Sequence, residues 1–396
     1  MFEYFTDNYV WNLSVVAALN SGGTIDEVDR ACRTLKEAAA RGEDAGTEDF
    51  LRAWTGLVDQ LAGQAQEAER RGRTRTAGEL YFRASSYLAL AERMLSNANP
   101  DRLPTYRRVL ELTEKAFELH DTTTSRVEIP YRADGAPEGA FLPAYFTRAE
   151  RTDGRPAPVV VQWNGLDSTK EHQYSSGFCH ALAARGISTL MVDTPGTGEA
   201  LRLQGLTARI GTEVFASACV DWLETRPDVD HERIGLVGWS LGGYFAPRAA
   251  AFEKRLALVV AWGANHDWGA VQRRRLKNEG ERPVPHYWEH VMWVWGYDDL
   301  DEFIAFADGI NLDGVVERIT VPFLITHGEN DRQIPVGYAH RSYEQAVNSP
   351  KRELRVFSRE EGGAEHVGLD HLPGVSAFVA DWIAETFAVP EEGTQP

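Results

Sequence analysis

The chain has 396 residues, of which 43% are hydrophobic and 25% are charged, a composition typical of a globular protein with a large core. This length suggests one large domain or two domains. The formal net charge of -18 at pH 7 argues against a nucleic-acid backbone or an anionic membrane surface as the partner.

The cysteines and the N-terminal residues bear on the cellular compartment. Cys32, Cys179 and Cys219 are odd in number and far apart, which is neither a disulfide framework nor a thiolate metal cluster. The first residues lack the basic cluster of a signal peptide, and the apolar run at 13–19 is short. We therefore expect a cytoplasmic protein without a transmembrane helix.

The first part of the chain, residues 1–122, predicts a helical domain. Thr24 and Glu27 have the spacing of a capping box at the start of a helix. Apolar residues then recur at helical spacing in TEDFLRAWTGLVDQLAGQAQEAERRG, AGELYFRASSYLALAERML and LPTYRRVLELTEKAFELH. Because no clear repeat period is present, these stretches indicate a compact helical domain rather than a repeat array.

From residue 123 to residue 396, short apolar strands alternate with helices. We expect strands at SRVEIPY, LPAYFTRAE, APVVVQWN, ISTLMVD, RIGLVGWS, RLALVVAWG, TVPFLITHG and RELRVFS. This alternation predicts an α/β fold, in which a mostly parallel, doubly wound sheet is covered by helices on both faces. The alternation breaks at about residues 264–319, where we expect a lid inserted into the core.

One glycine-rich motif lies where a predicted strand meets a predicted helix. The stretch RIGLVGWSLGGYFA places Ser240 between Gly238 and Gly242, in the pattern G-x-S-x-G. In this context the serine sits on a sharp turn at the start of the helix, and glycine lets the backbone pass closely. A turn without a catalytic role is the alternative and explains the context less well. Ser240 is the predicted nucleophile.

A serine nucleophile needs a base, and the base needs an orienting acid, in the chain order serine, acid, histidine. Asp331 follows the predicted strand TVPFLITHG and is favoured over Glu329, which comes too early. His366 follows RELRVFS after a glycine-containing loop and is favoured over His371, at the start of the last helix. His327, at the end of its strand, is expected to be structural.

The negative oxygen formed during acyl transfer needs two backbone donors. One is expected to be the N–H of Leu241, the residue after the nucleophile. The other is expected from the loop after the first core strand, where Gly165 and Leu166 follow Asn164.

Together these motifs resemble those of the α/β-hydrolase superfamily, from about residue 125 onward. With its helical N-terminal domain, the chain resembles the group that includes 2,6-dihydroxypseudooxynicotine hydrolases, fungal polyketide-shortening hydrolases and fermentation-respiration-switch esterases. The resemblance rests on NGLDSTKE, DTPGTGE, GWSLGG, WGANHDW, HGENDRQIP and GAEH. It implies a triad of Ser240, Asp331 and His366, and a substrate held between the core and the helical domain. It also implies that cleavage of a carbon–carbon bond next to a ketone, as in several members, is a possible reaction.

Carbon–carbon hydrolases of this group are thought to use an additional carboxylate, because a carbon leaving group departs poorly unless it is protonated. Asp267 in WGANHDW and Glu171 in NGLDSTKEH are the candidates for this auxiliary acid or base. For each of them, a solvated or N-capping carboxylate is the alternative interpretation.

The stretch PVPHYWEHVMWVWGY lies within the expected lid. His286, Glu289 and His290 match the zinc pattern H-x-x-E-H, but a zinc site needs a third protein ligand and would leave the serine motif unexplained. We therefore expect no metal. The aromatic side chains favour walls of a substrate pocket, or packing onto the helical domain. The candidate pocket residues are Trp163, Asn164, Trp239, His266, Tyr287, Trp288 and His290.

The expected function is that of a serine hydrolase that forms an acyl-enzyme with a small aromatic or polyketide-like carbonyl compound and uses no cofactor. The bond cleaved is either a carbon–carbon bond next to a ketone or, as the alternative, the bond of an ester, lactone or thioester. The same triad serves both reactions. A non-catalytic scaffold would be expected to lack a triad member. Related hydrolases often pair, so a homodimer is expected.

Overall fold

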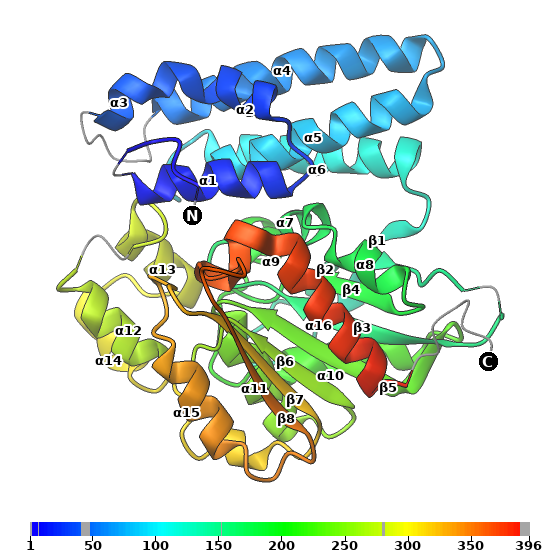
Figure 1. Ribbon diagram of the computed structural model, residues 1–396, viewed down its shortest axis with the longest axis vertical. Coiled ribbons are helices and arrows are strands. Elements are labelled where there is room, and N and C mark those ends of the chain that lie inside the picture. Colours follow the sequence, from blue (N-terminus) through cyan, green and yellow to red (C-terminus); the bar gives the residue numbers. More distant parts are fainter. Residues whose placement is uncertain (1, 7, 41–47, 152, 279–281, 389–396) are drawn as a thin grey trace. The chain divides into compact units, whose positions relative to one another are not determined.

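The computed structural model describes residues 2–6, 8–40, 48–151, 153–278 and 282–388. The chain forms two compact units (Figure 1). The first, the helical unit, consists of Met1–Ser125 and Asn278–Trp293. The second, the core unit, consists of Arg126–Lys277 and Val294–Pro396. The segment that the sequence marks as a lid, about 264–319, is thus divided between the two units.

The helical unit is built around a run of aromatic rings. Its N-terminal helices are α1 (Tyr9–Asn20), α2 (Ile25–Cys32), α3 (Lys36–Ala40), α4 (Glu48–Arg70), α5 (Thr74–Glu92) and α6 (Arg102–His120). Trp11 packs on Phe50, Phe50 on Trp54 and Trp54 on Tyr87, with ring centroids 5.2 to 6.0 Å apart. These rings are fully buried, so the helices pair through the apolar faces that the sequence predicts. Thr24 accepts the Glu27 N–H at 3.3 Å and caps α2, but the reciprocal bond of a capping box is replaced, because the Thr24 N–H donates to the Tyr87 hydroxyl at 3.1 Å.

A buried ion pair joins α5 to α6. Arg102 Nε donates to Glu92 Oε1 at 2.8 Å, and the side chains are 2% and 1% exposed. We expect Arg102→Met to lower the free energy of unfolding by about 3–5 kcal/mol, because the Glu92 carboxylate stays buried without this cation. The double variant Arg102→Met/Glu92→Leu should recover most of that loss in urea titrations. A double variant as unstable as the single one would contradict this explanation.

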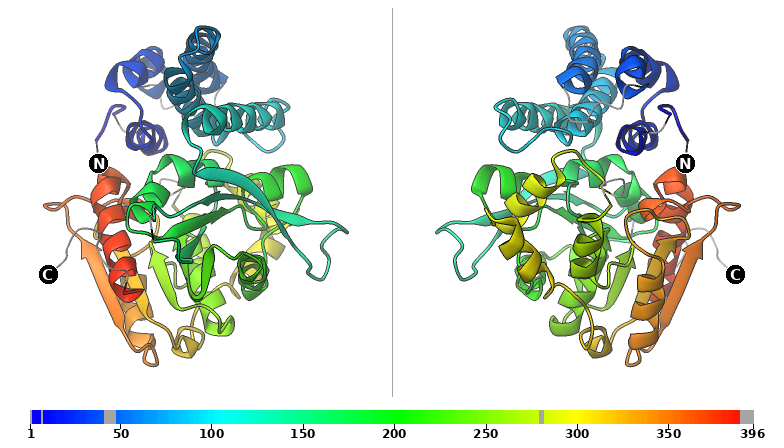
Figure 2. Two further views of the ribbon diagram at one scale, coloured as in Figure 1. Left: turned by 90° about the vertical axis from the view of Figure 1, so that its right-hand side faces the viewer. Right: turned by 90° about the vertical axis from the view of Figure 1, so that its left-hand side faces the viewer.

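The core unit contains an eight-stranded sheet with the order β1-β2-β4-β3-β5-β6-β7-β8 among the described residues. The strands are β1 (Thr124–Pro130), β2 (Phe141–Thr147), β3 (Ala157–Trp163), β4 (Ser188–Val192), β5 (Val229–Trp239), β6 (Leu258–Trp262), β7 (Phe323–Gly328) and β8 (Arg352–Phe357). Strands β3 to β8 are parallel to one another, whereas β2 runs antiparallel to β4. Figure 2 shows β8 at one edge of the sheet and the β1–β2 hairpin at the other.

Helices cover both faces of this sheet. After β3 the chain forms α7 (Lys170–Ser175), α8 (Phe178–Ala183), α9 (Gly198–Gln204), α10 (Glu213–Glu224), α11 (Gly242–Phe252), α12 (Trp268–Arg275), α13 (Tyr287–Trp295), α14 (Leu300–Ala307), α15 (Gly337–Gln345) and α16 (Leu372–Thr386). Val160 and Val237 pack with α8 and α16, which crosses in front of the strands in Figure 1. On the other face, Trp163 packs on Phe215 of α10 with ring centroids 6.1 Å apart.

The predicted fold class is confirmed: the core unit is an α/β-hydrolase sheet clothed by helices, and the N-terminal region is helical. The stretch KEHQYSSGFCHALAARG, which follows β3, holds two short helices rather than one. The helix is divided into α7 and α8, because Gly177 between them has φ 76°. No helix in the described part of the chain has both the length and the apolar character needed to cross a membrane.

Candidate active site

The backbone turns sharply between β5 and α11, and Ser240 lies at that turn. Ser240 has φ 57°, in the left-handed region that a side chain rarely adopts. Its N–H donates to the Trp262 carbonyl at 2.9 Å, which ties the turn to the end of β6. A Cβ on Gly238 would lie 2.0 Å from the Gly242 oxygen, so the strand can meet the helix only with glycine there. The strained conformation presents the Ser240 hydroxyl beyond the sheet.

The structure brings the three predicted triad residues into one hydrogen-bonded chain. His366 Nε2 is 2.9 Å from Ser240 Oγ, and His366 Nδ1 is 2.8 Å from Asp331 Oδ2. Asp331 follows β7 and His366 follows β8, so all three side chains come from carboxyl ends of parallel strands. Because parallel strands end at the same edge of a sheet, residues 240, 331 and 366 can meet despite their separation in sequence. This is the arrangement in which histidine accepts the serine proton.

The carboxylate of Asp331 is buried and fully engaged. Its Oδ1 accepts the N–H groups of Gln333 at 2.8 Å and Ile334 at 3.0 Å. Burial alone would raise the pKa of Asp331, but the charge and hydrogen bond of His366, with His327 and the backbone, lower it to about 2. Asp331 is therefore ionised throughout the range in which proteins work, as the orienting acid of a triad must be.

The neighbouring histidine and the rival residues have other surroundings. His327 Nε2 lies 2.9 Å from the Ile334 carbonyl, and burial lowers the pKa of His327. Glu329 is exposed and accepts the Arg359 N–H at 2.6 Å. His371 is exposed and occupies the N-cap position of α16.

The loop after β3 passes directly against the nucleophile. A Cβ on Gly165 would lie 2.8 Å from Ser240 Cβ and 3.2 Å from its Oγ. The Gly165 N–H donates to Ser168 Oγ at 3.3 Å, whereas Leu166 is buried beside it. Leu241 occupies the N-cap position of α11, so its N–H belongs to the helix start next to Ser240. The two predicted oxyanion donors, Leu241 and either Gly165 or Leu166, therefore belong to the segment that carries Ser240 and to the loop that passes against it.

A buried carboxylate that sequence reasoning missed holds this loop. Asp193, at the end of β4, accepts the Asn164 side-chain amide at 3.2 Å and the Lys170 N–H at 2.7 Å. Lys170 Nζ in turn contacts Asp193 at 3.0 Å, Glu199 at 3.0 Å and Glu171 at 2.7 Å. All five side chains are less than 10% exposed. Charged residues directly after apolar strands, in DTPGTGE and NGLDSTKE, were the available signal.

The two candidate auxiliary carboxylates make structural contacts. Glu171 is bound by Lys170 and by the Tyr145 hydroxyl at 2.7 Å. Burial alone would raise the pKa of Glu171, but Lys170 outweighs it and lowers the pKa below its usual range. Asp267 accepts the Ala270 N–H at 3.0 Å and caps α12, which is the alternative that the sequence left open.

The sequence matches the FrsA-like esterase family over residues 49–275. The chain belongs to this family. It also matches the prolyl oligopeptidase family over residues 174–389. As a member of these families the FrsA-like chain is a hydrolase, and the predicted resemblance to the α/β-hydrolases is confirmed.

The FrsA-like chain is similar to curated hydrolases over most of its length. It is 33% identical to the hydrolase acrC of Aspergillus aculeatus, over 98% of this chain and 99% of that protein. It is 28% identical to the 20-hydroxy-prefusarin hydrolase of Gibberella moniliformis, over 89% of this chain and 91% of that protein. It is 27% identical to the 2,6-dihydropseudooxynicotine hydrolase of Paenarthrobacter nicotinovorans, over 83% of this chain and 82% of that protein.

A solved structure shares the fold across both units' sequences. The crystal structure of 2,6-dihydroxy-pseudo-oxynicotine hydrolase superposes with a TM-score of 0.72 at 23% sequence identity. The alignment covers 94% of the FrsA-like chain and 95% of that protein. At this identity the similarity shows the fold alone.

The candidate pocket residues fall into two groups in the FrsA-like chain. Trp163, Asn164, Trp239 and His266 are buried in the core unit, where His266 Nδ1 lies 2.8 Å from Ser342 Oγ and Nε2 lies 3.1 Å from Asp313. Burial lowers the pKa of His266, which keeps its ring neutral. The other three, Tyr287, Trp288 and His290, lie in the segment of the lid that belongs to the helical unit.

The three residues of the H-x-x-E-H pattern, His286, Glu289 and His290, have different surroundings. Glu289 accepts the Ser96 hydroxyl and the Ala98 N–H, the latter at 3.2 Å, in the turn after α5. His286 is exposed, and His290 packs edge-on against Trp293 at 6.0 Å. Within the described ranges, no three histidine, cysteine, aspartate or glutamate side chains are grouped as metal ligands would be.

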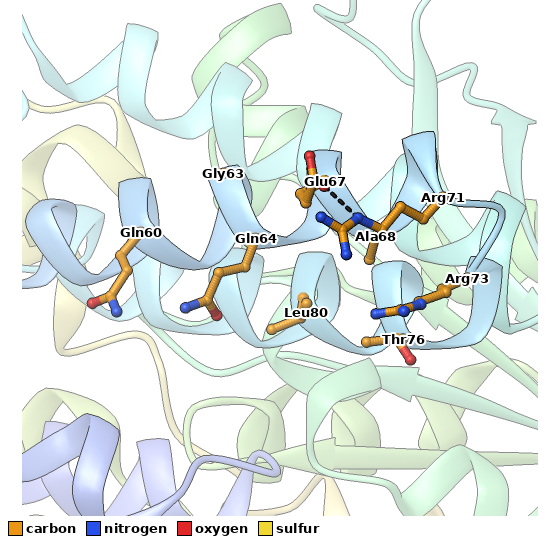
Figure 3. A pocket seen from close by; sticks show the side chains of 9 residues that line it. All are labelled: Gln60, Gly63, Gln64, Glu67, Ala68, Arg71, Arg73, Thr76 and Leu80. Atoms are coloured by element: carbon orange, nitrogen blue, oxygen red, sulfur yellow. Dashed lines mark hydrogen bonds and ion pairs between the residues drawn. The ribbon is translucent and has the colours of Figure 1, made fainter.

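Two surface grooves lie outside the triad. One, of about 490 Å³, runs between α4 and α5 of the helical unit, where Arg71 and Arg73 are beside each other and Glu67 binds Arg71 (Figure 3). The other, of about 380 Å³, is in the core unit and is lined by Arg209 with Trp295, Tyr297 and Phe306. Trp295 and Tyr297 are thus two aromatic residues of the predicted lid that line a surface groove.

Proposed function

We propose that the chain is a serine hydrolase that forms an acyl-enzyme on Ser240, with His366 as the base and Asp331 as the orienting acid. The observation that carries the proposal is the continuous hydrogen-bonded chain, 2.9 Å from Ser240 Oγ to His366 Nε2 and 2.8 Å from His366 Nδ1 to Asp331 Oδ2. The FrsA-like family is an esterase family, and the proposed triad provides a mechanism for hydrolysis.

In the proposed reaction, the Ser240 oxygen attacks a carbonyl carbon while His366 Nε2 takes its proton. Asp331 stabilises the imidazolium that forms. The N–H of Leu241 and a donor at Gly165 or Leu166 hold the negative oxygen. His366 then returns the proton to the leaving group, and a water activated by His366 releases the acid and restores Ser240. No cofactor takes part.

The proposed substrate is a small aromatic or polyketide-like carbonyl compound, cleaved at a carbon–carbon bond next to a ketone. In such a cleavage one water splits a 1,3-diketone into a carboxylic acid and a methyl ketone. The proton on the new methyl group comes from His366 in this scheme, because Glu171 and Asp267 are engaged in structural contacts. Two relatives are named as hydrolases of 20-hydroxy-prefusarin and of 2,6-dihydropseudooxynicotine, and these names support a small organic molecule as the substrate.

A second candidate is hydrolysis of an ester, lactone or thioester by the same triad, which the match to an esterase family favours. The test compares 1-phenylbutane-1,3-dione with p-nitrophenyl acetate, with products identified by mass spectrometry in ¹⁸O-labelled water. We expect cleavage of the diketone, with ¹⁸O in the carboxylic acid and none of this turnover in Ser240→Ala. Cleavage of the ester alone would favour the second candidate, and diketone cleavage by Ser240→Ala would contradict the acyl-enzyme.

A further inference from the structure

The loop that carries His366 has little regular structure of its own. It runs from the end of β8 to the start of α16 and contains a 3-10 segment, η4 (His366–His371), that is interrupted by a kink. Gly362 and Gly363 have φ of 83° and 86°, and Val367 has φ 50°. A β-branched residue such as Val367 is strained in that region, so other contacts must hold the loop in this shape.

One carboxylate binds the three peptide groups directly before the histidine. Asp370 Oδ2 accepts the N–H of Gly363 at 3.0 Å and of Ala364 at 3.2 Å. Asp370 Oδ1 accepts the N–H of Glu365 at 2.9 Å. Hydrogen bonds to an ionised acceptor are stronger than those between neutral groups. Both oxygens of Asp370 are therefore used to fix the backbone that leads into His366.

The far side of His366 is held by a different contact. The Trp262 indole N–H donates to the Val367 carbonyl at 2.8 Å, and the Gly368 N–H donates to the Glu365 carbonyl at 2.9 Å. Trp262 is the last residue of β6, and its carbonyl also accepts the Ser240 N–H. Trp262 therefore binds both the loop that carries His366 and the turn that carries the nucleophile. The loop is thus held by the Asp370 carboxylate before His366 and by Trp262, at the carboxyl end of β6, after it.

The same loop is tied to the segment that carries the orienting acid. The Asn330 N–H donates to the Ala364 carbonyl at 2.9 Å, and the Asn330 side-chain amide donates to Glu365 Oε1 at 2.7 Å. Asp370 also binds Ala364 and Glu365. A shift of these two peptide groups would therefore change the contacts of His366 with both Asp331 and Ser240.

We propose that Asp370 is a positioning residue for the hydrolysis: its carboxylate sets the distance between His366 and Ser240 by binding the amides of Gly363, Ala364 and Glu365. The inference rests on the proposed triad. Asp370 itself does not touch the reacting atoms. Without the carboxylate the three amides turn to water and the imidazole leaves its place, and a displacement of about 1 Å at a catalytic group costs roughly 100-fold in rate.

The test is a set of kinetic measurements on Asp370→Asn and Asp370→Glu with p-nitrophenyl acetate. The amide of the asparagine has one acceptor oxygen, and its NH₂ group faces a backbone donor, so part of the set of three bonds is lost. We expect kcat to fall about 10- to 100-fold with KM within about twofold. Asp370→Glu keeps both oxygens and should lose less than Asp370→Asn. Asp230→Asn is the matched control, because Asp230 accepts the Glu232 N–H at 3.0 Å elsewhere in the core unit.

Hydrogen exchange of the Gly363, Ala364 and Glu365 amides separates positioning from general loss of structure. In Asp370→Asn we expect faster exchange at this loop and unchanged exchange in the central strands. A kcat within twofold of wild type in Asp370→Asn would overturn the inference, as would faster exchange throughout the sheet. If Ser240→Ala is inactive while Asp370→Asn is fully active, the inference fails and the proposed function stands. If Ser240→Ala stays active, the proposed function fails.

Discussion

Ser240→Ala is expected to lower kcat by about 10⁴- to 10⁶-fold while leaving the fold intact, measured as initial rates with p-nitrophenyl acetate. The change removes the atom that forms the acyl-enzyme, and His366 Nε2 loses the hydroxyl that now lies 2.9 Å away. The oxyanion donors are backbone groups of Leu241 and the loop at Gly165, so the substitution leaves them in place. Binding of the substrate should therefore change little.

Ser217→Ala is the matched control for the loss of a serine hydroxyl. Ser217 lies in α10 and donates to Glu253 at 2.7 Å, in a contact that is not part of the triad. We expect its kcat to stay within a few-fold of wild type. A fluorophosphonate that labels serine nucleophiles should modify wild type and Ser217→Ala at one site and leave Ser240→Ala unmodified. Labelling of the Ser240→Ala variant would show that another serine is the nucleophile.

Asp331→Asn is expected to lower kcat by about 10³- to 10⁴-fold. Asp331 Oδ1 is held by the amides of Gln333 and Ile334, so the oxygen of the asparagine stays there and its NH₂ group takes the place of Oδ2. That NH₂ group donates to His366 Nδ1, which forces the proton onto Nε2. A protonated Nε2 cannot accept the proton of Ser240. Asp381→Asn, a surface carboxylate that pairs with Arg185, is the control and should keep its activity.

The same variant tests the electrostatics of the site through its stability. The pKa of Asp331 is lowered to about 2 in the folded chain, against an ordinary value of about 3.9. A lowered folded pKa stabilises the native state above the unfolded pKa, and this stability is lost as the pH falls through the folded value. We expect the stability difference between wild type and Asp331→Asn to shrink between about pH 4 and pH 2 in urea titrations. A difference that stays constant with pH would contradict an ionised Asp331.

The sequence predicted the fold and the order of the triad because both follow from short patterns. Ser240 is marked by two glycines within five residues, and the structure shows that a Cβ on Gly238 has no room. Asp331 and His366 were selected because each follows a predicted strand, and because the serine, acid and histidine come in that order along the chain. These inferences need only local sequence and the topology of a parallel sheet.

The buried charges are only partly indicated by such patterns. Charged residues directly after apolar strands are a local signal, but the 3.0 Å contacts of Lys170 with Asp193 and Glu199 depend on how two loops pack after β3 and β4. The role of Asp370 is similar, because a carboxylate that binds backbone amides in a loop has no periodicity. The division of the predicted lid between two units also depends on long-range packing.

That division has a consequence for the order in which the chain folds during synthesis. The segment Asn278–Trp293 completes the helical unit: Arg93 donates to the Pro283 carbonyl at 3.1 Å, and Glu289 binds the turn after α5. The ribosome makes this segment only after strands β1 to β6, which end at Trp262. The first unit to emerge is therefore completed only after six of the eight strands of the sheet have been made, and before β7 and β8. The helices α1 to α6 are thus synthesised long before their unit is complete, which happens when residue 293 of 396 has been made.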